Sequence, residues 1–247
     1  MASEPMALVR GAFPPATTKA WLVAIDAHPA WLRRDAGLDA AFNVHSSSLR
    51  LSSIPSLDAA VIANDLLGGP TGAVCSARLG DAVACNVDAC WVRRQYAPSR
   101  YPPGHSAHAW HQDGALGFDF LRPAQPPGAD QLLAMLTCWI ALTPCGADAP
   151  GLEWIDAETP GLLPPGALRD EAVRAAHDAA DFRRPVMRPG DCLAFGGNVL
   201  HHTHASPSMR HDRTSLEIRL FDASRIPERL VGDRFVALHR PFQRTSQ

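Results

Sequence analysis

Residues 132–142 form a nearly unbroken apolar run, which begins at Leu132 and ends at Leu142. The run is shorter than the roughly 18 apolar residues that a membrane-spanning helix requires. Its length suits a β-strand, and a strand without polar alternation is typically buried on both faces. The chain is therefore expected to fold around a central strand that other structure covers on both sides.

Other segments also have the pattern of strands. Apolar residues recur with a period of two over residues 83–91, and residues 192–200 and 214–221 are predicted to form two more strands. Frequent glycine and proline residues, 18 and 22 of them, favour many short strands joined by turns. This pattern is typical of a β-sandwich or a jelly roll.

Helical patterns are fewer and lie outside the predicted strands. Residues 15–35 predict an amphipathic helix, residues 57–66 a shorter one that Ser56 would cap, and residues 168–180 an alanine-rich insertion. We therefore expect a mostly β protein with flanking helices. A single domain is predicted over residues 1–247, with a helical N-terminal part, 1–80, and a jelly-roll core over about 81–222.

Composition narrows the possible partners and location. The net charge is −2, so no basic surface is expected that would bind nucleic acid or an anionic membrane. The first ten residues lack the apolar core of a secretory signal, and none of the six cysteines lies in a C-x-x-C pair. Buried, reduced thiols and a cytoplasmic location are predicted. The sequence does not indicate an oligomeric state.

A possible metal motif occurs at His111-Gln112-Asp113. On a strand, residues two apart point to the same face, so the imidazole and the carboxylate can converge. A triplet of this kind also occurs by chance in a chain with eleven histidines.

A second cluster of polar residues follows a turn at Gly190-Asp191. There a predicted strand ends in His201, His202 and His204. His201 and Thr203 would share one strand face, whereas His202 would point the other way. Such a cluster belongs either to a solvated loop or to a metal site.

The third element is Arg213, twelve residues after His201. It begins a strand whose apolar face carries Leu216, Ile218 and Leu220. The other face is polar and carries Arg213, Ser215, Glu217 and Arg219. This polar face lies either in solvent or along the wall of a polar cavity.

Together the three elements favour one kind of chemistry. Two histidines and a carboxylate leave three positions open on Fe(II), as oxygenases need when a co-substrate and O₂ bind together. A forked guanidinium such as that of Arg213 suits the far carboxylate of a diacid, and Thr203 can add a hydrogen bond.

At these residues, from about Asp81 to Phe221, the chain resembles the phytanoyl-CoA dioxygenase family of Fe(II)/2-oxoglutarate-dependent oxygenases. The segment from Leu136 to Leu142 resembles the central strand of the family, and Phe195 precedes His201 by the family spacing. Met209 and Arg213 continue the pattern.

The resemblance implies a double-stranded β-helix, a cupin-like jelly roll, around an Fe(II) ion held by His111, Asp113 and His201. It also implies 2-oxoglutarate held by Arg213 and Thr203, the use of O₂, and release of succinate and CO₂. Halogenating relatives replace the metal-binding carboxylate with a small residue. Because this chain has Asp113 at that position, the resemblance favours hydroxylation over halogenation.

The chain departs from the family at residues 150–156, where many relatives have an N-G-x-L stretch followed by a loop histidine. A contact made by that histidine is absent or replaced here.

Several other residues are candidates for the same site. Gln95 and Trp139 are candidates to bind the co-substrate, with Trp139 alternatively a core residue. The candidates to bind substrate are Arg93, Trp110, Trp154 and Glu217. Arg93 and Gln95 would alternatively lie at the surface, and Glu217 could form a buried ion pair with Arg219. His105 and His108 lie in a proline-rich loop, a candidate lid, and neither is predicted to be a ligand.

The substrate is expected to be a small-molecule metabolite or natural-product intermediate. Two other functions stay open at this point. One is a cupin-type metal enzyme that does not use 2-oxoglutarate, and the other is a non-catalytic jelly roll that binds a ligand. A dicarboxylate clamp at Arg213 and Thr203 would distinguish the proposed oxygenase from both.

Overall fold

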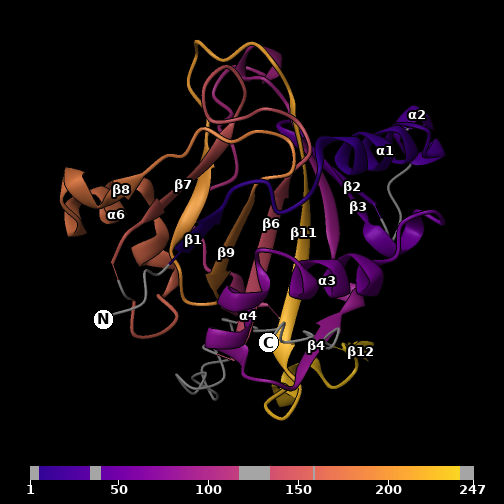
Figure 1. Cartoon of the computed structure of the whole chain (residues 1–247). Coiled ribbons are helices and arrows are strands. Elements are labelled where there is room, and N and C mark those ends of the chain that lie inside the picture. Colours follow the sequence, from indigo (N-terminus) through magenta and orange to yellow (C-terminus); the bar gives the residue numbers. More distant parts are fainter. Residues whose placement is uncertain (1–5, 34–39, 117–133, 158, 240–247) are drawn as a thin grey trace.

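The computed structural model describes residues 6–33, 40–116, 134–157 and 159–239, so Leu132 and Leu133 of the apolar run lie outside the described residues. Within these ranges the strands form two antiparallel sheets (Figure 1). The larger sheet has the order β1-β9-β6-β11-β5-β3-β2, with β4 paired to β11 and β12 to β4, and the smaller sheet has the order β10-β7-β8.

The strands of the larger sheet are β1 (Met6–Val9), β2 (Ala40–Phe42), β3 (Ser46–Arg50), β4 (Val83–Asn86), β5 (Trp91–Gln95), β6 (Met135–Ala141), β9 (Cys192–Gly196), β11 (Arg213–Asp222) and β12 (Phe235–Ala237). Those of the smaller sheet are β7 (Gly151–Ile155), β8 (Phe182–Arg183) and β10 (His201–His204). The helices are α1 (Pro15–Asp26), α2 (Pro29–Arg33), α3 (Ala59–Gly68), α4 (Gly72–Leu79) and α6 (Asp170–Ala176).

The two sheets pack against each other through an apolar cluster. Trp139 and Phe195 from the larger sheet meet Leu152 and Trp154 of β7 in this cluster. A backbone bridge between His111 and His201 adds the segment around His111 to the smaller sheet. The predicted fold class is confirmed: a mostly β protein with flanking helices, built as a cupin-like jelly roll.

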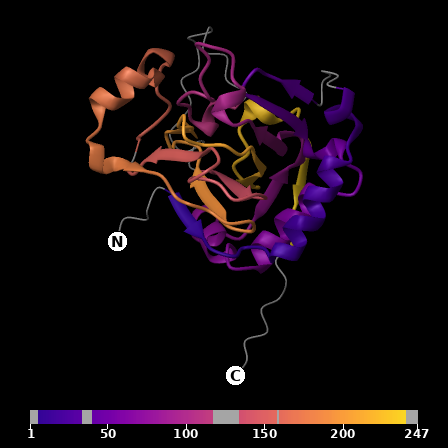
Figure 2. The same ribbon diagram turned by 90° about the horizontal axis from the view of Figure 1, so that it is seen from above.

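The central strands follow the predicted patterns. Every residue of β6 is buried, and β6 lies between β9 and β11. Leu216, Ile218 and Leu220 of β11 pack into the main core, to which α1, α3 and α4 contribute side chains. These helices cover the outer face of the larger sheet, while α6 lies on the opposite side of the molecule (Figure 2). The polar face of β11 therefore points into the space between the sheets.

Two predicted strands are interrupted. Residues 83–91 are not one strand, because a 3-10 turn at Val87–Ala89 separates β4 from β5, and the Asn86 side chain accepts a hydrogen bond from the Ala89 backbone at 3.1 Å. Residues 192–200 are not one strand either. β9 ends at Gly196, and His201 begins β10 in the other sheet.

The predicted helices are shorter than expected. The helix over 15–35 is divided before Pro29, whose ring has no backbone N–H to continue α1. The helix over 57–66 begins at Ala59 and is capped by Asp58, not Ser56, because the Asp58 carboxylate accepts from the Ala60 and Val61 amides. Only Asp170–Ala176 of the 168–180 insertion is α-helical.

The N-terminal part, 1–80, is not purely helical. It contributes β1, β2 and β3, which pair with one another or with later strands of the larger sheet. All six cysteines are buried thiols, and in the described ranges no helix has the length and apolarity needed to cross a membrane.

Candidate active site

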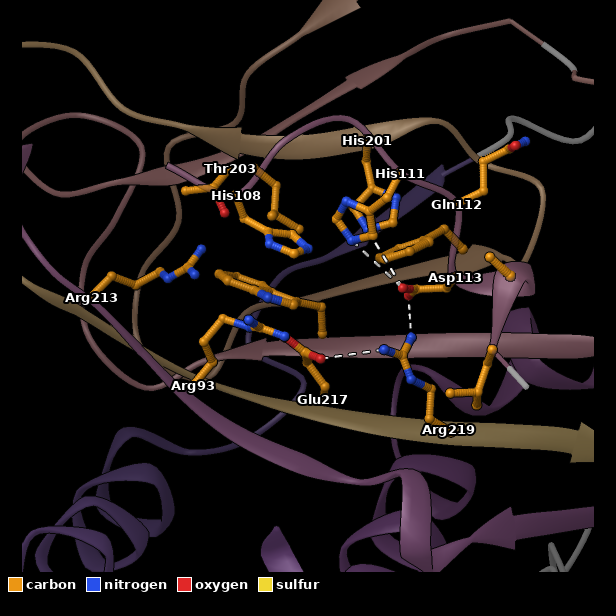
Figure 3. Close-up of a pocket in the computed structure, with 15 residues that line it drawn as sticks. Arg93, His108, His111, Gln112, Asp113, His201, Thr203, Arg213, Glu217 and Arg219 are labelled. Carbon is orange, nitrogen blue, oxygen red and sulfur yellow. Dashed lines mark hydrogen bonds and ion pairs between the residues drawn. The ribbon is translucent and has the colours of Figure 1, made fainter. Parts of the chain in front are cut away.

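Three possible metal-binding side chains meet between the sheets, at one end of the space that the polar face of β11 lines (Figure 3). The nearest ligand atoms of His111, Asp113 and His201 lie within 4.8 Å of one another. Oδ1 of Asp113 is 3.8 Å from Nε2 of His111 and 3.9 Å from Nε2 of His201. The segments of the two histidines are joined by backbone hydrogen bonds of 2.9 and 3.0 Å, which bring the imidazole rings to a centroid distance of 4.2 Å.

Hydrogen bonds orient both imidazoles in the same way. Nδ1 of His111 lies 2.9 Å from the carbonyl oxygen of Ala109, and Nδ1 of His201 lies 2.9 Å from that of Val199. Since a carbonyl only accepts, each Nδ1 carries the proton and each Nε2 presents a lone pair. Burial lowers the pKa of His201 and lowers that of His111 to about 3, so both rings are neutral and able to bind a metal at neutral pH.

Asp113 begins a 3-10 turn, Asp113–Ala115, and is not part of a regular strand. Its Oδ2 accepts a hydrogen bond of 2.7 Å from Thr137 and another from Arg219. Burial alone would raise the pKa of Asp113, but the charge of Arg219 holds it well below the usual value. The carboxylate is thus ionised, and Oδ1 faces the two histidines.

Arg213 is a fully buried cation without a hydrogen-bond acceptor among the described residues. The residue is 0% exposed, and none of its three guanidinium nitrogens has a hydrogen bond to the part of the chain that the structure describes. The guanidinium lies over the ring of Trp139, 4.9 Å from the centroid, and burial lowers its pKa to about 10. An unpaired buried charge is costly, which indicates a site for an anion. Figure 3 shows Arg213 at the far end of the cavity from Asp113.

The cluster and Arg213 line one cavity of about 270 Å³. Glu217 lies between two arginines on its wall. Nε of Arg93 donates to Oε1 of Glu217 at 2.9 Å, and Nη2 of Arg219 donates to Oε2 at 3.3 Å. A continuous chain of charges therefore runs from Arg93 through Glu217 and Arg219 to Asp113. The apolar part of the lining includes Leu116, Trp139, Leu152 and Phe195.

Seven of the predicted cofactor and substrate residues can now be placed besides Arg213. Four line the cavity: Thr203, Trp139, Arg93 and Glu217. Gln95, Trp110 and Trp154 do not line it.

The three residues outside the cavity have other contacts. Gln95 is buried, and its amide donates to the His45 carbonyl and to the Tyr101 hydroxyl, each at 2.7 Å. Trp110 directly precedes His111 and points the other way, where it donates to Asp170 at 2.9 Å and stacks on His202. Trp154 is packed in the apolar cluster between the sheets.

His108 and Thr137 are among the contributors to the site that were not predicted as site residues. His108 lines the cavity and makes an edge-on contact with His111, with ring centroids 4.4 Å apart. Thr137 holds Asp113. A signal for Thr137 was present in the sequence, because it is the one polar residue of β6 and shares a strand face with Trp139.

A jelly roll with two histidines and a carboxylate converging in an internal cavity defines a class of candidate mononuclear metal proteins. Within this class the chain belongs to the phytanoyl-CoA dioxygenase family, since the model described as "Phytanoyl-CoA dioxygenase (PhyH)" matches residues 6–212. His111, Asp113 and His201 lie inside the matched region, and Arg213 follows directly after it.

Solved structures share the fold at low sequence identity. EctD from S. alaskensis with bound Fe has a TM-score of 0.62 and 17% identity, over 90% of this chain and 74% of that one. SnoN, an epimerase described in complex with Fe3+, alpha ketoglutarate and nogalamycin RO, has a TM-score of 0.57 and 16% identity, over 96% and 82%. HygX from Streptomyces hygroscopicus, with nickel and 2-oxoglutarate bound, has a TM-score of 0.58 and 12% identity, over 89% and 84%. A comparison with curated proteins finds no match.

Proposed function

We propose that this chain is an Fe(II)- and 2-oxoglutarate-dependent dioxygenase that hydroxylates a small-molecule metabolite or natural-product intermediate and releases succinate and CO₂. The observation that carries the proposal is Arg213, a fully buried guanidinium that has no hydrogen bond to the described residues and lies in the same cavity as three converging metal donors. Family membership and the iron- and 2-oxoglutarate-containing structures of similar fold support it.

The residues present fit a divalent iron ion. His111, Asp113 and His201 would hold it through two neutral imidazole nitrogens and one carboxylate oxygen, a donor set that suits Fe(II). When bound, iron supplies the activation of O₂ and the oxidation of the substrate. Thr137 and Arg219 orient the Asp113 carboxylate through Oδ2, which leaves Oδ1 facing the two histidines.

The residues also fit 2-oxoglutarate. Arg213 would bind the carboxylate far from the metal, with Thr203 beside it in the cavity wall. Trp139, Leu152 and Phe195 exclude water from this region and so strengthen the ionic contact. A dicarboxylate co-substrate would supply the anion that this buried arginine lacks among the described residues, whereas a metal enzyme without one does not require an arginine at this place.

The outcome of the oxidation needs its own test, because the similar structures include one described as an epimerase and one described as a carbocyclase. Hydroxylation is proposed because Asp113 retains a carboxylate at the candidate metal site. Mass analysis of the product, with ¹⁸O₂ as the oxygen source, would show whether one oxygen atom is added.

Turnover of 2-oxoglutarate tests the proposal. We expect the protein to form succinate only when Fe(II), 2-oxoglutarate and O₂ are all present. His201→Ala should abolish this activity. Arg213→Met should raise the 2-oxoglutarate concentration required for half-maximal turnover by about 100-fold, because two charge-assisted hydrogen bonds contribute roughly 3 kcal/mol to binding. Arg210→Met, at an exposed arginine nearby, is the matched control. Unchanged turnover in the Arg213 variant would contradict the proposal.

We further propose a single domain and a cytoplasmic location. The domain proposal is supported by β1 and β3, which pair with β9 and β5 and so join the N-terminal part to the jelly-roll core. The location is supported by six buried free thiols, as a reducing compartment allows. The proposed partner is a small-molecule substrate.

A further inference from the structure

We propose that the substrate is a small organic monoanion, such as a carboxylic acid, and that Arg93 binds its charged group. The inference rests on the proposed function and adds to it the chemical class of the substrate. It is based on the contacts of Arg93, on the charges around the cavity and on the position of Arg93 in the larger sheet.

The guanidinium of Arg93 uses only one of its three nitrogens in hydrogen bonds to the described residues. Its Nε donates to Glu217 at 2.9 Å, and this is its one hydrogen bond to the described part of the chain. The two terminal nitrogens therefore have no acceptor there. The side chain is 22% exposed and lines the cavity, so these donors are accessible from the opening. A planar guanidinium with two free N–H groups suits a carboxylate better than a neutral group.

The charged side chains in the described lining of the cavity have one positive charge in excess. The described lining contains three arginines, Arg93, Arg213 and Arg219, and two acids, Asp113 and Glu217. His111 and His201 add no charge, because each directs Nδ1 to a backbone carbonyl and would offer an unprotonated Nε2 to the metal. Fe(II) would add two positive charges and 2-oxoglutarate two negative charges, which cancel. The loaded site keeps a charge of +1.

Arg93 carries this remaining charge. Arg219 is paired with both acids, and Arg213 would be paired with 2-oxoglutarate. Glu217 is shared between Arg219 and Arg93, which leaves Arg93 incompletely neutralised. A substrate that covers the cavity mouth removes water from this cation, and an unpaired cation is then costly. A substrate anion avoids that cost.

The position of Arg93 places the anion beside the co-substrate site rather than within it. Arg93 lies opposite Ser215 on the neighbouring strand, between Arg213 and Glu217 (Figure 3). Arg93 and Arg213 line the same cavity, and the positive charge of Arg93 contributes to the lowered pKa of Arg213. Two anionic groups, one on each arginine, would relieve the repulsion between these positive charges.

The test uses the full-length protein with Fe(II) and saturating 2-oxoglutarate, under nitrogen. Binding of three acids and their uncharged primary amides (benzoate and benzamide, hexanoate and hexanamide, indole-3-acetate and indole-3-acetamide) is followed by calorimetry and by the visible absorption of the iron–2-oxoglutarate complex. We expect at least one acid to bind about 10-fold or more tightly than its amide. Arg93→Met should remove this preference, Arg93→Lys should keep part of it, and both should lower the affinity for 2-oxoglutarate far less than Arg213→Met does.

Three results would overturn the inference. The first is that no acid binds more tightly than its amide. The second is a preference for acids that persists in Arg93→Met. The third is an Arg93→Met variant that loses as much affinity for 2-oxoglutarate as Arg213→Met does, which would make Arg93 a co-substrate ligand. Absence of 2-oxoglutarate binding to the wild-type protein would instead remove the proposed function, and this inference with it.

Discussion

Arg219 and Thr137 both bond to Oδ2 of Asp113, whereas Oδ1 is the oxygen that lies nearest to His111 and His201. One oxygen of the carboxylate is thus held by the larger sheet, and the other is left for a metal ion. The orientation of Asp113 is set by the protein itself. Arg219 is therefore a positioning residue for the candidate metal site, and a second contact, to Glu217, keeps Arg219 in place.

Removal of this contact should weaken metal binding. We expect Arg219→Met to lower the affinity for Fe(II) by about 10–100-fold, as is common when a group that orients a metal ligand is lost. Arg219→Lys, which keeps the charge, should recover part of the loss. The measurement is an anaerobic Fe(II) titration of the wild type, both variants and the exposed control Arg210→Met. Equal affinities in all four proteins would contradict the positioning role.

A second ionic cluster, outside the cavity, should make stability depend on pH. Glu153 is fully buried and accepts hydrogen bonds from Arg184 at 2.7 Å and from His202 at 2.6 Å. Burial would raise the pKa of Glu153, but the bonds from His202 and Arg184 lower it below the usual value. Because its folded pKa is lowered, Glu153 stabilises the fold above the unfolded pKa of about 4.3. This contribution is lost as the pH falls from there through the folded pKa.

Glu153→Gln should therefore reduce the free energy of unfolding by about 1–2 kcal/mol at pH 7, a value discounted because Arg184 is nearly half exposed. Urea denaturation at pH 7, 5, 4 and 3 should show the difference from wild type shrinking at the acidic end. Glu171→Gln, at an exposed acid on α6, should show little difference at any pH. A difference in unfolding free energy between wild type and Glu153→Gln that does not change with pH would contradict this explanation.

Gly190 has a backbone conformation that other residues avoid. Its φ is 93°, and a Cβ added there would overlap the carbonyl oxygen of Phe13. Gly190→Ala should cost about 2 kcal/mol or more of unfolding free energy, from strain and from displacement of the Phe13 segment. Gly161→Ala, where a Cβ meets no atom within 4 Å, should cost much less. The two variants can be compared by urea denaturation, and similar losses would refute the argument.

The sequence predicted the features that depend on local pattern. The alternation along β11 separates an apolar face from a polar one because side chains on a strand alternate, and the structure buries these faces in the core and in the cavity wall. The family resemblance, together with the spacing of His111, Asp113 and His201, predicted that these three residues lie close together, and their donor atoms are within 4.8 Å of one another. Their role as metal ligands stays a prediction.

Features that depend on tertiary contacts could not be predicted in this way. The pairing of Arg219 with Asp113 joins residues 106 positions apart, and no local pattern indicates it. Trp110 was predicted to bind substrate, but neighbouring residues of an extended segment point to opposite sides, and Trp110 faces α6 instead of the cavity that His111 lines. The 3-10 turn before β5 interrupts the alternation of residues 83–91, so the pattern before the turn does not give the side-chain directions of Arg93 and Gln95 beyond it.

The most direct test of the central claim is whether the site selects a diacid through Arg213. The protein with Fe(II), kept under nitrogen, is titrated with 2-oxoglutarate and with 2-oxopentanoate, which has the same chain length but no second carboxylate. We expect 2-oxoglutarate to bind about 100-fold more tightly to the wild type and to lose most of that advantage in Arg213→Met, because two charge-assisted bonds contribute roughly 3 kcal/mol. Equal binding of the two keto acids to the wild type would contradict the account.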